Sequence, residues 1–155
     1  MLNDLNAGTS QGPIGREGRV YREASPTELI YIATRMIVVS HSSLSGTVGR
    51  AQFEAAVAHL EARYGILRSV VEDGYFVART DDRSAVETWL PAEEGSAEAM
   101  YARLLNADLD TSKTLYAIHV IAAHDAIDVF MLTSHAITDA TSLIELHSCL
   151  AHTLL

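Results

Sequence analysis

Apolar positions recur along the chain with two different spacings, which predict helices and strands after residue 20. Spacings of three and four residues, with charged side chains elsewhere on the wheel, indicate amphipathic helices. Short β-branched and aromatic runs indicate strands. The helices are expected at residues 26–34, 49–64, 94–106 and 138–155. The strands are expected at 35–42, on both sides of Asp73-Gly74 within 66–79, and at 85–91, 114–123 and 126–135.

Turn and cap residues mark the ends of several of these elements. Ser25, followed by Pro26 and by Glu28 three residues after the serine, has the pattern of a helix capping box. "SLIE" at 142–145 has the same pattern in the last helix. Because strands and helices are mixed without regular alternation, we expect an α+β domain with a mixed, mostly antiparallel sheet covered by helices. The last two strands are apolar on both faces, which places them near the centre of that sheet.

Length and charge narrow the class of protein. A chain of 155 residues, 48% of them hydrophobic, suffices for one packed domain. Residues 1–20 lack periodicity, so we divide the chain into a flexible leader, 1–20, and a folded domain, 21–155. The formal charge of -9 disfavours nucleic acid as a partner, and no apolar run is long enough for a membrane span. The polar start lacks a signal peptide's apolar stretch, so a cytoplasmic location is expected.

Most histidines and the single cysteine give no sign of metal chemistry. Cys149 has no second cysteine with which to form a disulfide, and a buried thiol on an apolar helix face is its simplest interpretation. His147 and His152 are five residues apart, about 140° around a helix, so they do not share a metal-binding face. His119 shares a strand face with apolar residues, which indicates packing or a pocket wall. We therefore expect no metal.

The segment "TSHAITDATS", residues 133–142, contains the most suggestive chemistry. Strand alternation places Thr133 and His135 on one face of the last strand and Ser134 on the other. An imidazole at the end of a central strand is held by rigid backbone and is mostly neutral at pH 7, as a general base requires. Asp139 is either a partner that orients this base or an ordinary N-cap of the last helix. Spacing alone leaves both interpretations open and favours the structural one.

"SHAITDA" also resembles the H-H-x-x-x-D-G signature of the chloramphenicol acetyltransferase-like superfamily, which includes nonribosomal peptide condensation domains. The resemblance extends from about residue 20 to 155. It is greatest to the N-terminal half of polyketide-associated acyltransferases of the phthiocerol dimycocerosyl transferase type. The other similar segments, in the family's order, are "REASPTELIY", "VGRAQFEAAVAHLEARYGILRSVVEDGYFVA" and "LDTSKTLYAIHVI".

This resemblance implies a fold and roles for individual residues. The fold would be a two-layer sandwich, one half of a two-domain architecture. His135 matches the second histidine, the general base for attack of a hydroxyl or amine on an acyl thioester. Asp139 matches the aspartate that pairs with an arginine and orders the loop, and Arg22 or Arg35 is the expected partner. Ser134 stands in place of the first histidine, a change expected to affect folding more than chemistry. Ala140 stands in place of the glycine, which narrows the pocket or retires the site.

The same resemblance implies the reaction partners. The donor would be an acyl group on coenzyme A or on the phosphopantetheine of a carrier protein, in polyketide or lipid biosynthesis, with no permanently bound cofactor. Since family members are more than twice as long, the C-terminal domain is absent, and a homo-oligomer or a separate C-terminal-half chain would complete the cleft. Two alternatives remain. One is a non-catalytic half-domain that binds a carrier protein, an acyl chain or a partner subunit, and the other is a different acid-base reaction at His135.

Overall fold

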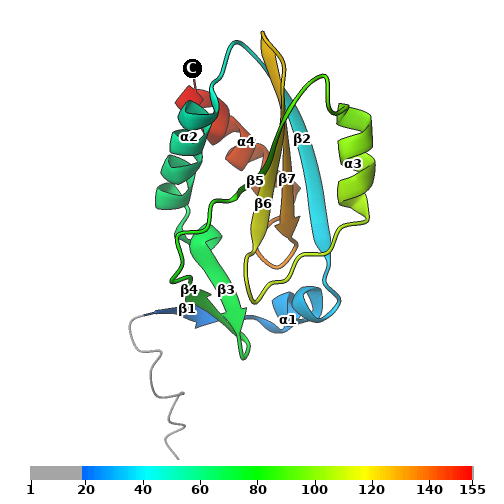
Figure 1. The fold of residues 1–155 in the computed structure, drawn as a ribbon. Coiled ribbons are helices and arrows are strands. Elements are labelled where there is room, and N and C mark those ends of the chain that lie inside the picture. The colour runs from blue at the N-terminus through cyan, green and yellow to red at the C-terminus, as the bar shows by residue number, and fades with distance from the viewer. Residues whose placement is uncertain (1–18, 155) are drawn as a thin grey trace, which may run out of the picture.

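In the computed structural model, which describes residues 19–154, a four-stranded sheet forms the centre of the fold (Figure 1). The strand order is β2-β7-β6-β5, so the last two strands of the chain are central, as predicted. β7 is antiparallel to both neighbours, and β5 is parallel to β6. The bounds are β2, Ile37–Ser45; β5, Val86–Pro91; β6, Tyr116–Ala122; and β7, Ala126–Ser134. The predicted α+β class with a mixed, mostly antiparallel sheet is thus confirmed.

Helices cover both faces of this sheet. The helices are α1, Pro26–Ala33; α2, Arg50–Arg63; α3, Ala97–Leu105; and α4, Ala140–Leu154. α2 and α4 lie together on one face, where Leu143, Leu146 and Leu150 of α4 join Val129 and Met131 of β7 in the main core. α3 covers the opposite face, where its Met100 and Leu104 pack against Phe130 of β7. The alternation predicted for β7 therefore holds, and both of its faces are buried.

A second, smaller sheet lies beside α1 at the lower end of the view in Figure 1. Its strand order is β1-β4-β3, with β1, Val20–Glu23; β3, Ser69–Glu72; and β4, Tyr75–Ala78. A short 3-10 helix, η1, Gly65–Arg68, connects α2 to β3. Asp73 and Gly74 form the turn of the β3-β4 hairpin with φ of 48° and 81°. Two left-handed residues in succession fit the twist of a hairpin, which explains the Asp-Gly pair.

Local signals located most elements to within a few residues. α1 begins at the predicted capping box, where the Ser25 hydroxyl accepts from the Glu28 amide and the Glu28 carboxylate accepts from the Ser25 amide. Two predictions were wrong. The strand expected to end at 42 continues to Ser45, because Ser42 and Leu44 pair with β7. The "SLIE" box does not cap a helix, since α4 already begins at Ala140.

The ends of the chain were predicted less completely. β1 begins at Val20, and the prediction contained no strand there. The predicted leader, 1–20, lies outside the described residues except for Arg19 and Val20. Among the helices formed by residues 19–154, none is both long and apolar enough to cross a membrane.

Candidate active site

His135 lies in the tight loop that connects the central strand β7 to α4. Its amide donates to the carbonyl of Met36 at 2.9 Å, which extends the pairing of β7 with the β2 side by one residue. The imidazole is half-buried, whereas Ser134 beside it is 1% exposed. The residue chosen from the sequence as a base is thus at the mouth of a rigid strand, with its side chain partly open to solvent.

The imidazole is fixed by two contacts that the sequence did not reveal. Its Nδ1 lies 2.7 Å from the carbonyl oxygen of Thr138. A carbonyl only accepts, so Nδ1 carries the proton and the neutral ring presents Nε2 as a lone pair. The ring also stacks on Tyr31 of α1, with centroids 4.4 Å apart and planes 6° from parallel. His135 is therefore oriented and set in the tautomer that leaves Nε2 free to accept a proton.

Hydroxyl groups brace the loop around this histidine. Thr138 Oγ1 lies 2.9 Å from Thr133 Oγ1 and donates to the Ser134 carbonyl at 3.2 Å, and both threonines are buried. Ser134 Oγ accepts from the Ala136 amide at 3.3 Å, and the Ile137 amide donates to the Ser134 carbonyl at 3.1 Å. These short-range bonds hold the Thr138 carbonyl in place opposite Nδ1.

Asp139 caps a helix in this structure and does not bind the imidazole. Its carboxylate accepts from the Ser142 amide at 2.7 Å, and its carbonyl accepts the first helical bond, from Leu143. The backbone bond from Ser142 lowers the pKa of Asp139 below its ordinary 3.8. The predicted arginine partner was wrong, because Arg22 forms two hydrogen bonds with Glu28 and Arg35 pairs with Asp108. Of the two interpretations of Asp139, the N-cap is the one observed.

Replacing Asp139 with alanine is expected to lower the thermal midpoint by about 2–4 °C, because the Ser142 amide loses its acceptor. Asp139→Asn keeps a capping oxygen, so its thermal midpoint should fall by less than that of the alanine variant. Some of the stability that this cap contributes depends on the charge of the Asp139 carboxylate. Because the pKa of Asp139 is lower in the folded chain, that contribution is complete above pH 3.8. It is lost as the pH falls through the lowered folded pKa. Thermal unfolding at pH 7 and pH 3 measures both effects, and an unchanged midpoint for the alanine variant at pH 7 would rule out the cap.

Ser134 and Ala140, which depart from the signature that this segment resembles, are accommodated without positive φ in the backbone. Ser134 is buried on the face opposite His135's side of β7, and its hydroxyl bonds within the loop. Ala140 is exposed in the first turn of α4. Among the described non-glycine residues, positive φ occurs only at Arg35 and Asp73, so the backbone at 140 does not need glycine.

A second histidine with unusual surroundings lies between β2 and α4. His147 has Nε2 2.8 Å from the Ser40 hydroxyl and Nδ1 2.7 Å from the Ser42 hydroxyl. A neutral imidazole has one donor and one acceptor, so one serine donates and the other accepts. Burial, aided by the nearby His41, lowers the pKa of His147 from 6.5 to about 4. The sequence gave no sign of this cluster, because its residues are more than a hundred positions apart.

We expect His147 to make stability depend on pH. Since its folded pKa of about 4 lies below the unfolded value near 6.5, the unfolded chain binds the proton first, and stability is lost as the pH falls from 6.5 towards 4. Urea unfolding at pH 7 and pH 5 should differ by on the order of 1 kcal/mol from this group. His147→Gln should reduce the difference, and His152→Gln, exposed on α4, should keep it. Identical pH dependence in wild type and His147→Gln would contradict this assignment.

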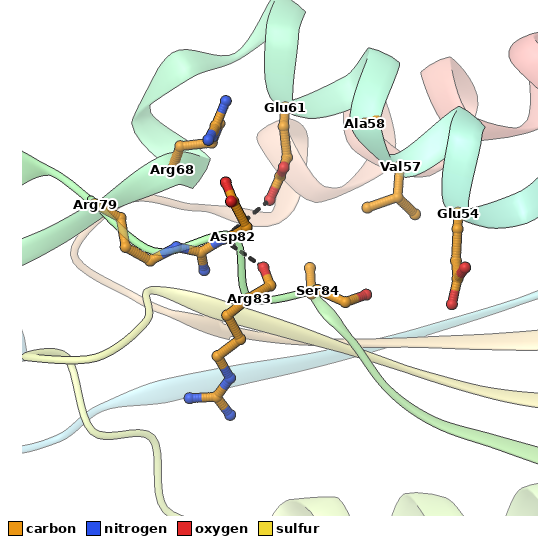
Figure 2. A pocket seen from close by; sticks show the side chains of 10 residues that line it. Glu54, Val57, Ala58, Glu61, Arg68, Arg79, Asp82, Arg83 and Ser84 are labelled. Carbon is orange, nitrogen blue, oxygen red and sulfur yellow. Dashed lines mark hydrogen bonds and ion pairs between the residues drawn. The ribbon is translucent and has the colours of Figure 1, made fainter.

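The pocket in Figure 2 is lined by both acidic and basic side chains. It has a volume of about 240 Å³ and lies between α2 and residues 79–85. Arg79 donates to the Arg83 carbonyl at 2.6 Å and pairs with Asp81 at 2.8 Å, while Glu61 lies 4.0 Å away. The Arg79 side chain is only 5% exposed. Because the charge of Arg79 is already compensated by Asp81 and Glu61, this pocket is a weaker candidate than the His135 loop. Among residues 19–154, no three His, Cys, Asp or Glu side chains form a metal-binding group.

The fold was compared with known proteins. No protein family profile matches the sequence. No curated protein matches it either. Solved structures do match: a mutant of the starter condensation domain of the rhizomide synthetase RzmA has a TM-score of 0.72 at 14% identity, over 86% of this chain and 37% of that one. Another structure of the same domain, at 14% identity and a TM-score of 0.66, was determined in complex with C8-CoA.

Two further matches come from other biosynthetic systems. The X-domain from teicoplanin biosynthesis has a TM-score of 0.70 at 18% identity, over 92% of this chain and 33% of that one. Polyketide synthase associated protein 5 from Mycobacterium tuberculosis has a TM-score of 0.60 at 18% identity, over 86% of this chain and 32% of that one. The chain therefore spans about a third of the length of these proteins. Over that part its fold is similar to that of these condensation domains.

Proposed function

We propose that this protein takes part in acyl transfer, with His135 as the general base. The observation that carries the proposal is the hydrogen bond from Nδ1 to the Thr138 carbonyl, which leaves Nε2 of a half-buried, oriented imidazole free to accept a proton. The shared fold supports the same reaction class, since the matching structures are condensation domains and a polyketide synthase associated protein.

The proposed reaction needs one base and no cofactor. Nε2 takes the proton from an acceptor hydroxyl or amine as the oxygen or nitrogen attacks the thioester carbonyl carbon. The carbon–sulfur bond then breaks, and the leaving thiolate takes the proton back from Nε2. The products are an ester or amide and a free thiol. While the ring is positively charged, the Thr138 carbonyl opposite Nδ1–H stabilises it.

The proposed donor is an acyl thioester of coenzyme A or of a carrier-protein phosphopantetheine. The structure with C8-CoA supports this class of donor for the fold. A small apolar pocket of about 120 Å³, lined by Ile137, Thr138 and Ser142 among others, adjoins the same loop. We further propose that a second copy of the chain, or a separate chain equivalent to the remainder of the matching proteins, covers the His135 side.

The test is turnover by the full chain with octanoyl-CoA as donor and a panel of alcohols and amines as acceptors. Release of free thiol, together with a new ester or amide of the expected mass, supports the proposal. Octanoyl-CoA that binds but stays intact with every acceptor, including when carrier-bound octanoyl thioester replaces it, would overturn it.

A non-catalytic half-domain is the second candidate. The observation that favours it is that Asp139, the match to an aspartate that pairs with an arginine, is exposed and caps α4 instead. Such a protein would bind a carrier protein, acyl chain or partner subunit without producing free thiol. Intact mass spectrometry of the mixture separates the two candidates, because binding alone leaves the masses of donor and acceptor unchanged.

A further inference from the structure

β2 presents an open backbone edge at the side of the four-stranded sheet. It is the outermost strand and pairs with β7 without a break over nine residues. Just beyond its two ends, the Met36 carbonyl accepts from His135, and the Gly46 amide donates to the Asp125 carbonyl. Backbone groups of alternate residues point to alternate sides of a strand. The even-numbered residues of β2 therefore bond to β7, and the odd-numbered residues point away from the sheet.

The outward groups of this edge are unpaired within the described part of the chain. The amides and carbonyls of Val39, His41 and Ser43 make no hydrogen bond to any group in residues 19–154. Soluble proteins usually protect such an edge with lysine, proline or a bulge. Residues 36–48 contain no Lys, Arg, Asp, Glu or Pro, and the β2-β7 register shows no irregularity. The edge is thus long and regular and contains no Lys, Arg, Asp or Glu of its own, in a chain whose formal charge is -9.

Side chains on both faces of β2 anchor this strand to α4 and β7. On one face, Ser40 and Ser42 bond to His147 of α4. On the other, His41 and Ser43 both bond to Asp128 of β7, at 2.8 Å and 2.5 Å, and His41 stacks on Phe130. The Asp128 carboxylate is therefore partnered, and these contacts order β2 before any partner arrives. An ordered edge loses less entropy on pairing than a mobile one.

We propose that β2 pairs with β2 of a second copy of this chain, antiparallel and across a two-fold axis at His41. The register places His41 opposite His41 of the partner subunit and Val39 opposite Ser43 of the partner subunit, so all the outward groups find partners. The pairing is self-complementary, as a two-fold interface requires. The absence of Lys, Arg, Asp and Glu along the edge lets two acidic chains meet there without local repulsion.

This pairing also has a consequence near the His135 loop. The antiparallel register brings the Ser45 end of the partner's strand beside Ile37, next to Met36, whose carbonyl binds the His135 amide. Met36 is 42% exposed. The inference identifies a surface for the self-association included in the proposed function, and does not depend on acyl transfer. Because association is measured without substrate, a failure of either proposal can be recognised separately.

The test removes one outward N–H group from β2. Ser43→Pro removes the outward N–H and leaves the β2-β7 hydrogen bonds intact, since proline is tolerated on an edge strand at such a position. Ser43→Ala is the matched control, because it also loses the hydroxyl bond to Asp128 but keeps the amide. Light scattering and sedimentation equilibrium of the full chain give the association state, and circular dichroism confirms that each variant is folded.

We expect the wild type and Ser43→Ala to be dimers at micromolar concentration. Ser43→Pro, which removes two symmetric hydrogen bonds per dimer and places a ring against the partner, should dissociate with a Kd raised about tenfold or more. A monomeric wild type would overturn the proposal, including the case in which β2 pairs with a strand of another polypeptide instead. A folded Ser43→Pro variant that dimerises as strongly as Ser43→Ala would also overturn it.

Discussion

His135→Ala is expected to reduce the rate of acyl transfer by about a hundredfold to ten-thousandfold, the usual contribution of a general base. The structural reason is that the rest of the loop offers no replacement. Asp139 is exposed and caps α4, and the Thr138 carbonyl has no proton to exchange. His135→Gln should lose as much rate, because its amide fills a similar volume but is not a base.

Two controls make this result specific to His135. His59→Ala removes an exposed imidazole from α2 and should transfer at the wild-type rate. Thermal unfolding should show that His135→Gln remains folded, since the imidazole is only half-buried. Transfer by folded His135→Gln at the wild-type rate would show that His135 is not the base, whatever the reaction of the protein is.

Phe130→Ala is expected to cause the largest loss of stability, about 3–5 kcal/mol in the free energy of unfolding. Phe130 lies in the central strand and is 0% exposed. It packs against Met100 and Leu104 of α3 and stacks on His41 of β2 with ring centroids 4.5 Å apart. Its removal leaves a cavity at the point where α3, β7 and the edge strand meet, which the surrounding side chains cannot fill completely.

The matched control is another aromatic residue on the same face of the fold. Tyr101 of α3 is 39% exposed, so Tyr101→Ala should change the free energy of unfolding by about 1 kcal/mol or less. Urea denaturation of both variants at pH 7 measures the difference between them. Equal losses in the two would contradict the assignment of Phe130 to a close-packed layer under α3.

The sequence predicted those features that depend on neighbouring residues. The Ser25 capping box, the Asp73-Gly74 hairpin and the alternation along β7 are all local, and each was found where the pattern placed it. The position of His135 followed in the same way, because a strand that ends at Ser134 directs the next side chain out of the sheet. A resemblance in motif order supplied the fold, which the solved structures confirm.

What the sequence could not supply are contacts between distant segments and contacts to backbone. The acceptor for His135 is the carbonyl of Thr138, and every residue type has a carbonyl. Tyr31 stacks on the ring only because α1 folds against the end of β7. The partner expected for Asp139 failed for the related reason that Arg22 and Arg35 found nearer carboxylates, Glu28 and Asp108.

The position of the proton on His135 tests most directly whether this residue can act as the base. Nitrogen-15 NMR of the histidine-labelled full chain, assigned by comparison with His135→Gln, distinguishes the two neutral tautomers. We predict a proton on Nδ1, bonded to the Thr138 carbonyl, and an unprotonated Nε2 at pH values where the ring is neutral. A proton on Nε2 would contradict the proposed role of His135, because the nitrogen proposed to act as the base would then have no lone pair to offer.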